Sequence, residues 1–259
     1  MNRRVWILLA AVAAAIVVVF LFPATPQNEA YHNFADQRPL LGIANCLNVI
    51  SNAPFLFIGL AGMGLTLRGT RAGKNLFVDA RERWPWFALF VGVALTAFGS
   101  AWYHHRPNDH TLVWDRIPMT IGFLSLVAAV VAERISLRAG IRILLPLIAS
   151  GIGSVVYWEI TQTRGHGDLR PYAIAQFGSL LVLVLIFVLF PARYSRGSDF
   201  IVSLALYGVA KILEAADKPV FALGGIVSGH TIKHLFAALS AYWILHMLRR
   251  RAPLQVAPH

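Results

Sequence analysis

The stretch Ser179–Phe190, "SLLVLVLIFVLF", has no polar side chain after its first residue. A strand of an outer-membrane barrel alternates apolar and polar residues over about ten positions, and this run does not alternate. An average soluble domain has roughly 25% charged residues, whereas this chain of 259 residues has 14% charged and 57% hydrophobic residues and a mean hydropathy of +0.62. We therefore predict an all-α, polytopic membrane protein.

Eight apolar runs approach the roughly 20 residues that a helix needs to cross a bilayer. They are Val5 to Phe22, Asn45 to Leu67, Trp84 to Tyr103, Leu112 to Ala132, Ile141 to Trp158, Tyr172 to Phe190, Phe200 to Ala216 and His230 to Leu248. We predict a seven-transmembrane-helix bundle (45–248) preceded by a transmembrane or signal-anchor helix (1–22) and an extracytoplasmic loop (23–44), with a basic cytoplasmic tail at 249–259. "MNRR" and the first run also match a cleaved secretory signal, but the run is longer than a typical signal core, which favours a retained helix.

The formal charge of +11 is distributed along the chain in a regular way. Basic residues fall in every second connection, at Arg3 and Arg4, at Arg68, Arg71, Lys74, Arg81 and Arg83, at Arg134, Arg138 and Arg142, at Arg193 and Arg196, and at Arg249 to Arg251. The positive-inside rule places these connections and both termini in the cytoplasm. Charges dispersed over five loops argue against nucleic-acid binding, which one basic face would indicate. The single cysteine, Cys46, excludes an intrachain disulfide.

This topology brings unusual polar residues to one side of the membrane. In "GSAWYHHRPNDHTLVWDRIP" (99–118), Ser100 and His104 fall at the outer end of one helix and Asp115 lies in the first turns of the next. The last helix starts on the same side with "SGHTIKH", which spaces His230 and His234 four residues apart. Ionisable groups within a bilayer are costly unless they are paired or functional, so we predict a site at this depth.

The pattern of three histidines is typical of a metal centre. Histidines at i and i+4 have Cβ atoms about 6 Å apart on one helix face, and a third from another helix completes three ligands. Three protein ligands and one open position form the catalytic zinc pattern. Two histidines with this spacing are a weak signal alone, since structural histidines are common. Their conjunction with His104, Asp115 and Ser100 favours Zn²⁺ on His104, His230 and His234.

Four motifs together resemble the alkaline ceramidases, which belong to the CREST superfamily of seven-helix membrane hydrolases. They are "SAWYH" (100–104), "WDRIPM" (114–119), "SGHTIKH" (228–234) and "NVISNAPFLFIG" (48–59), and the resemblance extends over about residues 31–248. It implies zinc on the three histidines, Ser100 and Asp115 as catalytic residues beside the metal, and hydrolysis of the amide of a ceramide-like lipid to a sphingoid base and a fatty acid. The superfamily also includes receptors, so the alternative is a seven-helix receptor or lipid-binding protein with a structural zinc.

The chain departs from the family in one place. Eukaryotic alkaline ceramidases bind calcium through an acidic stretch before the first core helix, where this chain has "YHNFADQRPLLGIANCLN" (31–48) with Asp36 as its one carboxylate. Calcium takes six to eight oxygen ligands, several of them charged, so Ca²⁺ is not favoured and we expect Asp36 to pair with Arg38. The short loops are compatible with a bacterial inner membrane, with the site near the periplasmic face and a lipid amide as partner.

Other polar residues within the predicted helices receive structural interpretations. We expect Lys211 and Glu214 to form an ion pair, with contact to a substrate headgroup as the alternative. We expect Asn48 and Asn52 to bond neighbouring helices, with a role beside the site as the alternative. Broken helices and related halves, which a transporter would show, are not evident. We expect the remaining histidines of interest to lie outside the metal centre: His105, His110, His166 and His246.

Overall fold

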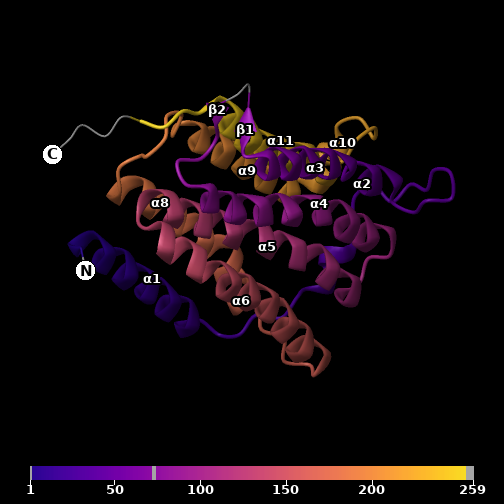
Figure 1. Cartoon of the computed structure of the whole chain (residues 1–259). Coiled ribbons are helices and arrows are strands. Elements are labelled where there is room, and N and C mark those ends of the chain that lie inside the picture. Colours follow the sequence, from indigo (N-terminus) through magenta and orange to yellow (C-terminus); the bar gives the residue numbers. More distant parts are fainter. Residues whose placement is uncertain (1, 72–73, 255–259) are drawn as a thin grey trace.

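The computed structural model describes residues 2–71 and 74–254 (Figure 1). It is an all-α bundle, as predicted, with one two-stranded antiparallel turn among the described residues. The last part of the predicted basic tail, 255–259, lies outside the described residues. The fold class expected from the apolar runs is therefore confirmed.

The elements follow one another in a simple order. They are α1 (Arg3–Leu21), η1 (Glu29–His32), α2 (Cys46–Ile50), α3 (Ala53–Arg68), β1 (Thr70–Arg71), β2 (Lys74–Asn75), η2 (Ala80–Glu82), α4 (Arg83–His105), α5 (Asp109–Arg134), α6 (Leu137–Thr163), α7 (Arg170–Ala173), η3 (Ile174–Gly178, a π-helical turn), α8 (Ser179–Leu189), α9 (Asp199–Ala215), α10 (Asp217–Ala222) and α11 (Gly229–Arg250). Each of the eight predicted apolar runs corresponds to one helix or to consecutive helical pieces.

Among the described residues, six spans are long and apolar enough to cross a membrane by length and composition. They are Arg3–Leu21, Cys46–Arg68, Ala80–His105, Asp109–Arg134, Leu137–Thr163 and Arg170–Leu189. The other two predicted helices, α9 and α11, fall outside this group. Helix α9 is 17 residues long, and α11 carries His230, Lys233 and His234 in its first turns. The least apolar of the long helices is therefore the one that brings most of the ionisable groups to the site.

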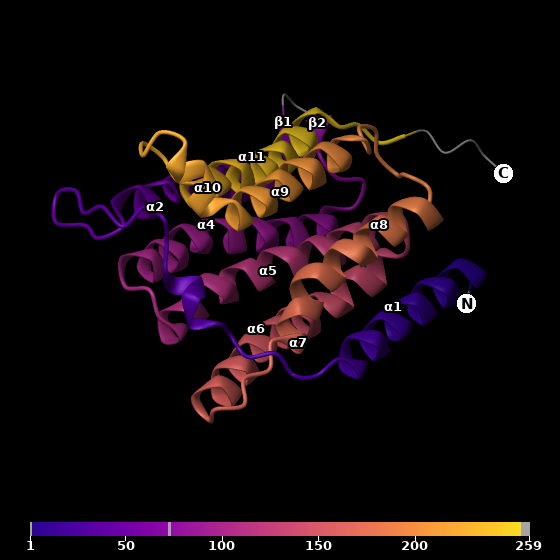
Figure 2. The same ribbon diagram turned by 180° about the vertical axis from the view of Figure 1, so that it is seen from behind.

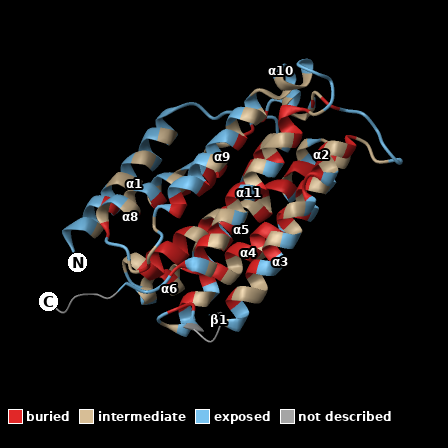
Figure 3. Cartoon of the chain, turned by 90° about the horizontal axis from the view of Figure 1, so that it is seen from above, coloured by how far each residue is buried: buried red, intermediate tan, exposed pale blue. Residues whose placement is uncertain are grey.

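Helices α4 and α5 lie at the centre of the bundle, α3 packs against α4, α6 packs against α5, and α11 packs against α9 and α3 (Figure 1). Figure 3 shows the buried residues concentrated on α4, α5 and α11, whereas α1 is largely exposed. The core includes Trp86, Phe90, Ile186 and Leu245, each less than 2% exposed. Helix α1 lies on the outside of the bundle against α8 and η3, where exposed apolar side chains suit contact with lipid.

Two irregularities separate the structure from eight uninterrupted helices. The second run divides into α2 and α3 at Ser51–Asn52, just before Pro54, which has no backbone N–H to donate. The sixth run contains the π-helical turn η3, a feature frequent at functional sites. Both lie close to the polar end of the bundle or to the pocket described below.

The start of α1 and the end of α11 lie at one end of the bundle (Figure 1). The end of α4 and the start of α11, which carry His104, His230 and His234, lie at the other. The basic connections fall at the end that holds the start of α1. This arrangement is the one that the alternation of charged loops predicted. A membrane protein follows from the apolar spans, whereas the identity of the membrane stays a prediction.

Candidate metal centre

Three histidines from two helices meet at the end of the bundle opposite the start of α1. His104 comes from the last turn of α4, and His230 and His234 come from the first two turns of α11. Each is at most 4% exposed, and one ring nitrogen from each lies within 4.8 Å of the others. The convergence expected from the sequence is therefore confirmed, and the cluster is a site that can hold a metal ion.

Local sequence explains why the helices start and end here. The side chain of Ser228 caps α11 by accepting a hydrogen bond from the Thr231 N–H, so His230 and His234 fall in the first two turns. Helix α5 begins with a capping box in which Asn108 and Thr111 bond each other's backbone. This start places Asp115 in the second turn of α5, at the depth of the histidines.

The hydrogen bonds of the histidines fix their tautomers. His104 Nδ1 lies 2.6 Å from the carbonyl oxygen of Ser100, which accepts only from a protonated nitrogen. The Ser51 hydroxyl donates to the carbonyl of Asn48 at 3.1 Å and accepts from His234 Nδ1 at 2.8 Å. Both Nε2 atoms therefore present lone pairs, with Nδ1 held by an outer partner as in most metal-ligating histidines.

The Nε2 atoms at the centre of the cluster need a proton or a cation to bind. His234 Nε2 is buried without a hydrogen-bond partner in the described residues. His104 Nε2 lies 2.7 Å from His230 Nε2, so these two nitrogens share one proton when no ion is bound, and His234 Nε2 is left without a donor among the residues described. A buried, unsatisfied acceptor is costly, and a cation removes this cost. The residues present therefore fit a metal ion.

Ser100 and Asp115 lie beside the triad. They are 3% and 6% exposed, and both line the same pocket as His234. Gly99 makes this proximity possible, because a Cβ atom there would overlap the carbonyl of Trp114 on α5. Absence of a side chain at Gly99 thus lets α5 bring Asp115 against the last turns of α4. All five predicted site residues are together at this end of the bundle.

Residues 22–45, which we call the strap, cross the outer end of the bundle between α1 and α2 (Figure 2). Phe34 is 3% exposed, and its ring centre lies 4.9 Å from that of His104 and 4.6 Å from that of His230. Asn45 donates to the carbonyl oxygen of His104 at 2.7 Å. The strap therefore covers the triad on its outer side.

Asp217 connects the strap to α11. One carboxylate oxygen accepts from the Ala35 N–H and the other from the His230 N–H, both at 2.8 Å. The expected pair of Asp36 and Arg38 is present, with Arg38 Nη2 2.8 Å from the carboxylate, and Arg38 also donates to the carbonyls of Gly225 and Ile226. Hydrogen bonding from Arg38 lowers the pKa of Asp36 below its ordinary value.

Several residues that support the site were not identified from the sequence: Phe34, Asn45, Ser51 and Asp217. Of these, Ser51 had a visible signal, since it lies with Asn48 and Asn52 in a polar patch of an otherwise apolar run. Asn48 bonds across to Thr231 on α11 at 2.7 Å, as expected. Asn52 instead donates to the Asn48 carbonyl in its own chain segment, so its predicted bond to a neighbouring helix is wrong.

The four histidines that the sequence placed outside the metal centre have other contacts. His110 lies 3.1 Å from Glu159, His166 bonds the carbonyl of Arg164, and the ring of His246 lies near Trp243. His105 lies near the ring of Trp102. None belongs to the cluster of potential metal ligands found in the described residues.

A pocket of about 480 Å³ extends from the triad into the bundle. Its polar end includes Ser100, Asp115 and His234, and most of the remaining wall is apolar, with contributions from α4, α5, η3, α8, α9 and α11. The lining residues of α4 run from Leu89 to Ser100, a length of about 16 Å at 1.5 Å per residue. The pocket is therefore long and narrow enough for a hydrocarbon chain.

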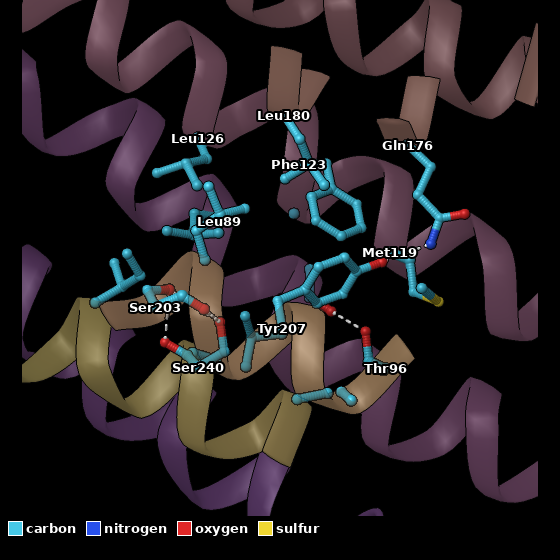
Figure 4. A pocket seen from close by; sticks show the side chains of 18 of the residues that line it. Leu89, Thr96, Met119, Phe123, Leu126, Gln176, Leu180, Ser203, Tyr207 and Ser240 are labelled. Atoms are coloured by element: carbon cyan, nitrogen blue, oxygen red, sulfur yellow. Dashed lines mark hydrogen bonds between the residues drawn. The ribbon is translucent and has the colours of Figure 1, made fainter. Parts of the chain in front are cut away.

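The wall of this pocket is least tightly packed between α8 and α9. Helix α9 packs along α11, and no comparable packing joins α9 to α8 in the described residues. Val188 of α8 and Ile201 of α9 line the pocket and are 77% and 70% exposed. Figure 4 shows Gln176 and Tyr207 pointing toward each other, and they are joined by a 2.7 Å hydrogen bond. The pocket thus opens laterally, toward the lipid-facing side.

Comparison with known proteins adds no family assignment. No protein-family model matches the sequence, and no curated protein is significantly similar to it. The argument for function therefore rests on the histidine triad, on Ser100 and Asp115 beside it, and on the pocket that begins there.

Proposed function

We propose that this protein is a zinc-dependent intramembrane amidase that hydrolyses the N-acyl amide of a ceramide-like lipid to an amine and a fatty acid. The observation that carries this proposal is the unpartnered Nε2 atom of His234 in a buried triad, at the polar end of a long apolar pocket. A metal on this triad would lie beside the carboxylate of Asp115 and the hydroxyl of Ser100, at the end of a channel for a hydrocarbon chain. Such a site suits cleavage of a lipid near its headgroup.

His104, His230 and His234 would hold the zinc. When bound by three neutral imidazoles, zinc supplies a Lewis acid and lowers the pKa of water to roughly 7. Two neighbouring groups hold the imidazoles in place. The carbonyl of Ser100 and the hydroxyl of Ser51 hold the Nδ1 protons of His104 and His234, which keeps both Nε2 lone pairs directed at the ion.

We assign Asp115 the transfer of a proton from water to the departing amine. Hydrolysis forms a bond between the acyl carbon and a water oxygen and breaks the bond to the amide nitrogen, so one water proton must pass to the departing amine. The Asp115 carboxylate lines the pocket beside Ser100 and serves as base and then as acid, a contribution of typically 10²- to 10⁴-fold. The Ser100 hydroxyl donates to the carbonyl oxygen as it gains negative charge.

The pocket and strap determine how the lipid is held. The acyl chain lies along the apolar wall, whose length of about 16 Å accommodates a long chain. Phe34 covers the outer side of the triad, and the lateral opening between α8 and α9 gives access from the lipid side. Exclusion of water by Phe34 strengthens the hydrogen bonds inside the site.

A seven-helix receptor with a structural zinc is the second candidate. A closed structural zinc site has four protein ligands, whereas a catalytic one keeps a position open. The cluster in the described residues offers three ligands, which favours the enzyme.

The test uses protein purified in detergent, with zinc content measured by mass spectrometry and fatty-acid release measured from ceramides. We expect His230→Ala to lose both zinc and activity, and Asp115→Asn to keep zinc and lose at least about 100-fold in kcat. His246→Ala, which changes a histidine remote from the triad, is the matched control and should keep both. Stoichiometric zinc with no release from any lipid amide would favour the receptor instead.

A further inference from the structure

Three charged residues at the polar end of the pocket have no role in the proposed hydrolysis. Lys211 and Glu214 of α9 and Lys233 of α11 all line the pocket together with Ser100 and Asp115. Glu214 pairs with Lys211, as the sequence predicted, and accepts from Lys233 Nζ at 2.9 Å. It also accepts from the Tyr31 hydroxyl of the strap at 3.0 Å.

The two ammonium groups have spare donors. An ammonium carries three N–H groups, and within the described residues Glu214 is the one hydrogen-bond acceptor found for each lysine. The side chain of Lys233 is only 14% exposed, so its other donors depend on whatever occupies the pocket. Lys211 lies 5.9 Å from the ring centre of Phe177 on η3, so its ammonium reaches across the lateral opening.

The charges of the wall indicate the sign of the occupant. Apart from His234, the residues of the wall that carry charge are Asp115, Glu214, Lys211 and Lys233. Asp115 is assigned to proton transfer, and Glu214 is the one carboxylate in the described residues that pairs with both lysines, so the cluster of Lys211, Glu214 and Lys233 carries one net positive charge. A net charge in a buried site is costly unless a counter-charge neutralises it, so an anionic group beside this cluster is favoured over a neutral one, with or without a metal ion.

We propose that Lys211 and Lys233 form a binding subsite for a carboxylate that is attached to a long acyl chain. A carboxylate has two acceptor oxygens, one for each ammonium, and the apolar wall takes the chain. The carboxylate has two possible sources: an acidic headgroup on the amide nitrogen, as in an N-acyl amino acid, or the fatty acid released by hydrolysis. The second source rests on the proposed function, whereas binding itself needs no catalysis.

The test measures binding to the metal-free full chain in detergent, by titration calorimetry. The probes are N-palmitoylglycine, its neutral counterpart N-palmitoylethanolamine, and palmitate. We expect the unaltered chain to bind N-palmitoylglycine at least tenfold more tightly than N-palmitoylethanolamine. Equal affinity for these two probes would overturn the proposal.

The decisive variant carries Lys211→Met, Glu214→Gln and Lys233→Met together, because removing all three charges leaves no unpaired buried ion. It should lose the preference for the acid and keep its affinity for the neutral amide, and a preserved preference would overturn the subsite. Lys218→Met changes an exposed lysine outside the pocket and should bind as the unaltered chain does. If the triple variant fails to fold, Lys211→Met alone should reduce the preference at least threefold, and an unchanged preference would overturn the proposal.

The affinity for palmitate, compared with that for N-palmitoylglycine, distinguishes the two possible sources of the carboxylate. Tighter binding of N-palmitoylglycine than of palmitate assigns the subsite to a substrate headgroup, and the reverse assigns it to the released fatty acid. Failure of the amidase proposal is distinguishable. A chain that binds the acidic probes through Lys211 and Lys233 but hydrolyses no amide refutes the amidase and leaves the subsite intact.

Discussion

Alanine at Gly99 tests whether the chemistry depends on where α5 holds Asp115. A Cβ atom at Gly99 would overlap the carbonyl oxygen of Trp114 and lie 2.7 Å from its carbonyl carbon, where ordinary contact begins at 3.4 Å. The distance from this Cβ atom to the carbonyl carbon is therefore 0.7 Å too short for ordinary contact, and the distance to the carbonyl oxygen is shorter still. We expect α5 to withdraw, and a misplacement of about 1 Å costs roughly 100-fold in rate.

The assay compares kcat for amide hydrolysis with zinc content and thermal stability. We expect Gly99→Ala to lose about 100-fold in kcat and to keep its zinc, because no histidine of the triad lies on α5. Gly153→Ala is the matched control, since a Cβ atom there meets nothing within 4 Å, and it should keep full activity. Unchanged kcat in Gly99→Ala would refute the role given to Asp115, and loss of zinc would show that α4 had moved instead.

Further predictions concern the pocket, the inner end of the bundle and the strap. Leu180→Trp fills the pocket near its middle, so it should reduce hydrolysis of long-chain amides more than of short-chain ones, as competition between the two substrates would measure. Arg251 Nη2 lies 2.7 Å from the Glu133 carboxylate, and both side chains are at most 6% exposed. Arg251→Met removes this ion-pair partner and should therefore lower the free energy of unfolding by about 3–5 kcal/mol, as denaturant titration would measure. Because Arg38 lowers the pKa of Asp36, their pairing stabilises the strap fully above the ordinary Asp pKa of about 3.9 and is lost as the pH falls through the lowered value. Once the intrinsic pH dependence of exchange is corrected for, the protection of the amides of residues 22–45 against hydrogen exchange should therefore fall only in acid, and Asp36→Asn should lower it at neutral pH as well, whereas protection that already falls near pH 6 would contradict this assignment.

The histidine triad could be predicted because its position follows from two strong signals. Long apolar runs define the helices, and alternating basic connections define which ends meet. Once these are fixed, His104 and the pair His230 and His234 must fall at the same end. The resemblance to alkaline ceramidases rests on the same residues, and it remains an interpretation of them.

The strap could not be predicted in the same way. Residues 22–45 have no long helical or alternating pattern, and the contacts of Phe34 with His104 and His230 depend on how this segment crosses the end of α4 and the start of α11. Asp217 contributes through two backbone N–H groups, a role that leaves no signature in its neighbours. The division between α2 and α3 was missed because apolar residues on both sides of the polar patch at Ser51 and Asn52 form one run long enough to span a membrane, although Pro54 marks the break.

The distribution of the three histidines along the chain has a consequence for the timing of assembly. Synthesis proceeds from the N-terminus, so His104 is translated 126 residues before His230 and waits in the bilayer without its fellow ligands. Helix α9, which lies mainly against α11, has no firm place in the bundle until that helix arrives. A nascent chain that has inserted everything up to α10 therefore has one of the three histidines at this end of the bundle, and the buried triad is complete only when α11 has been inserted.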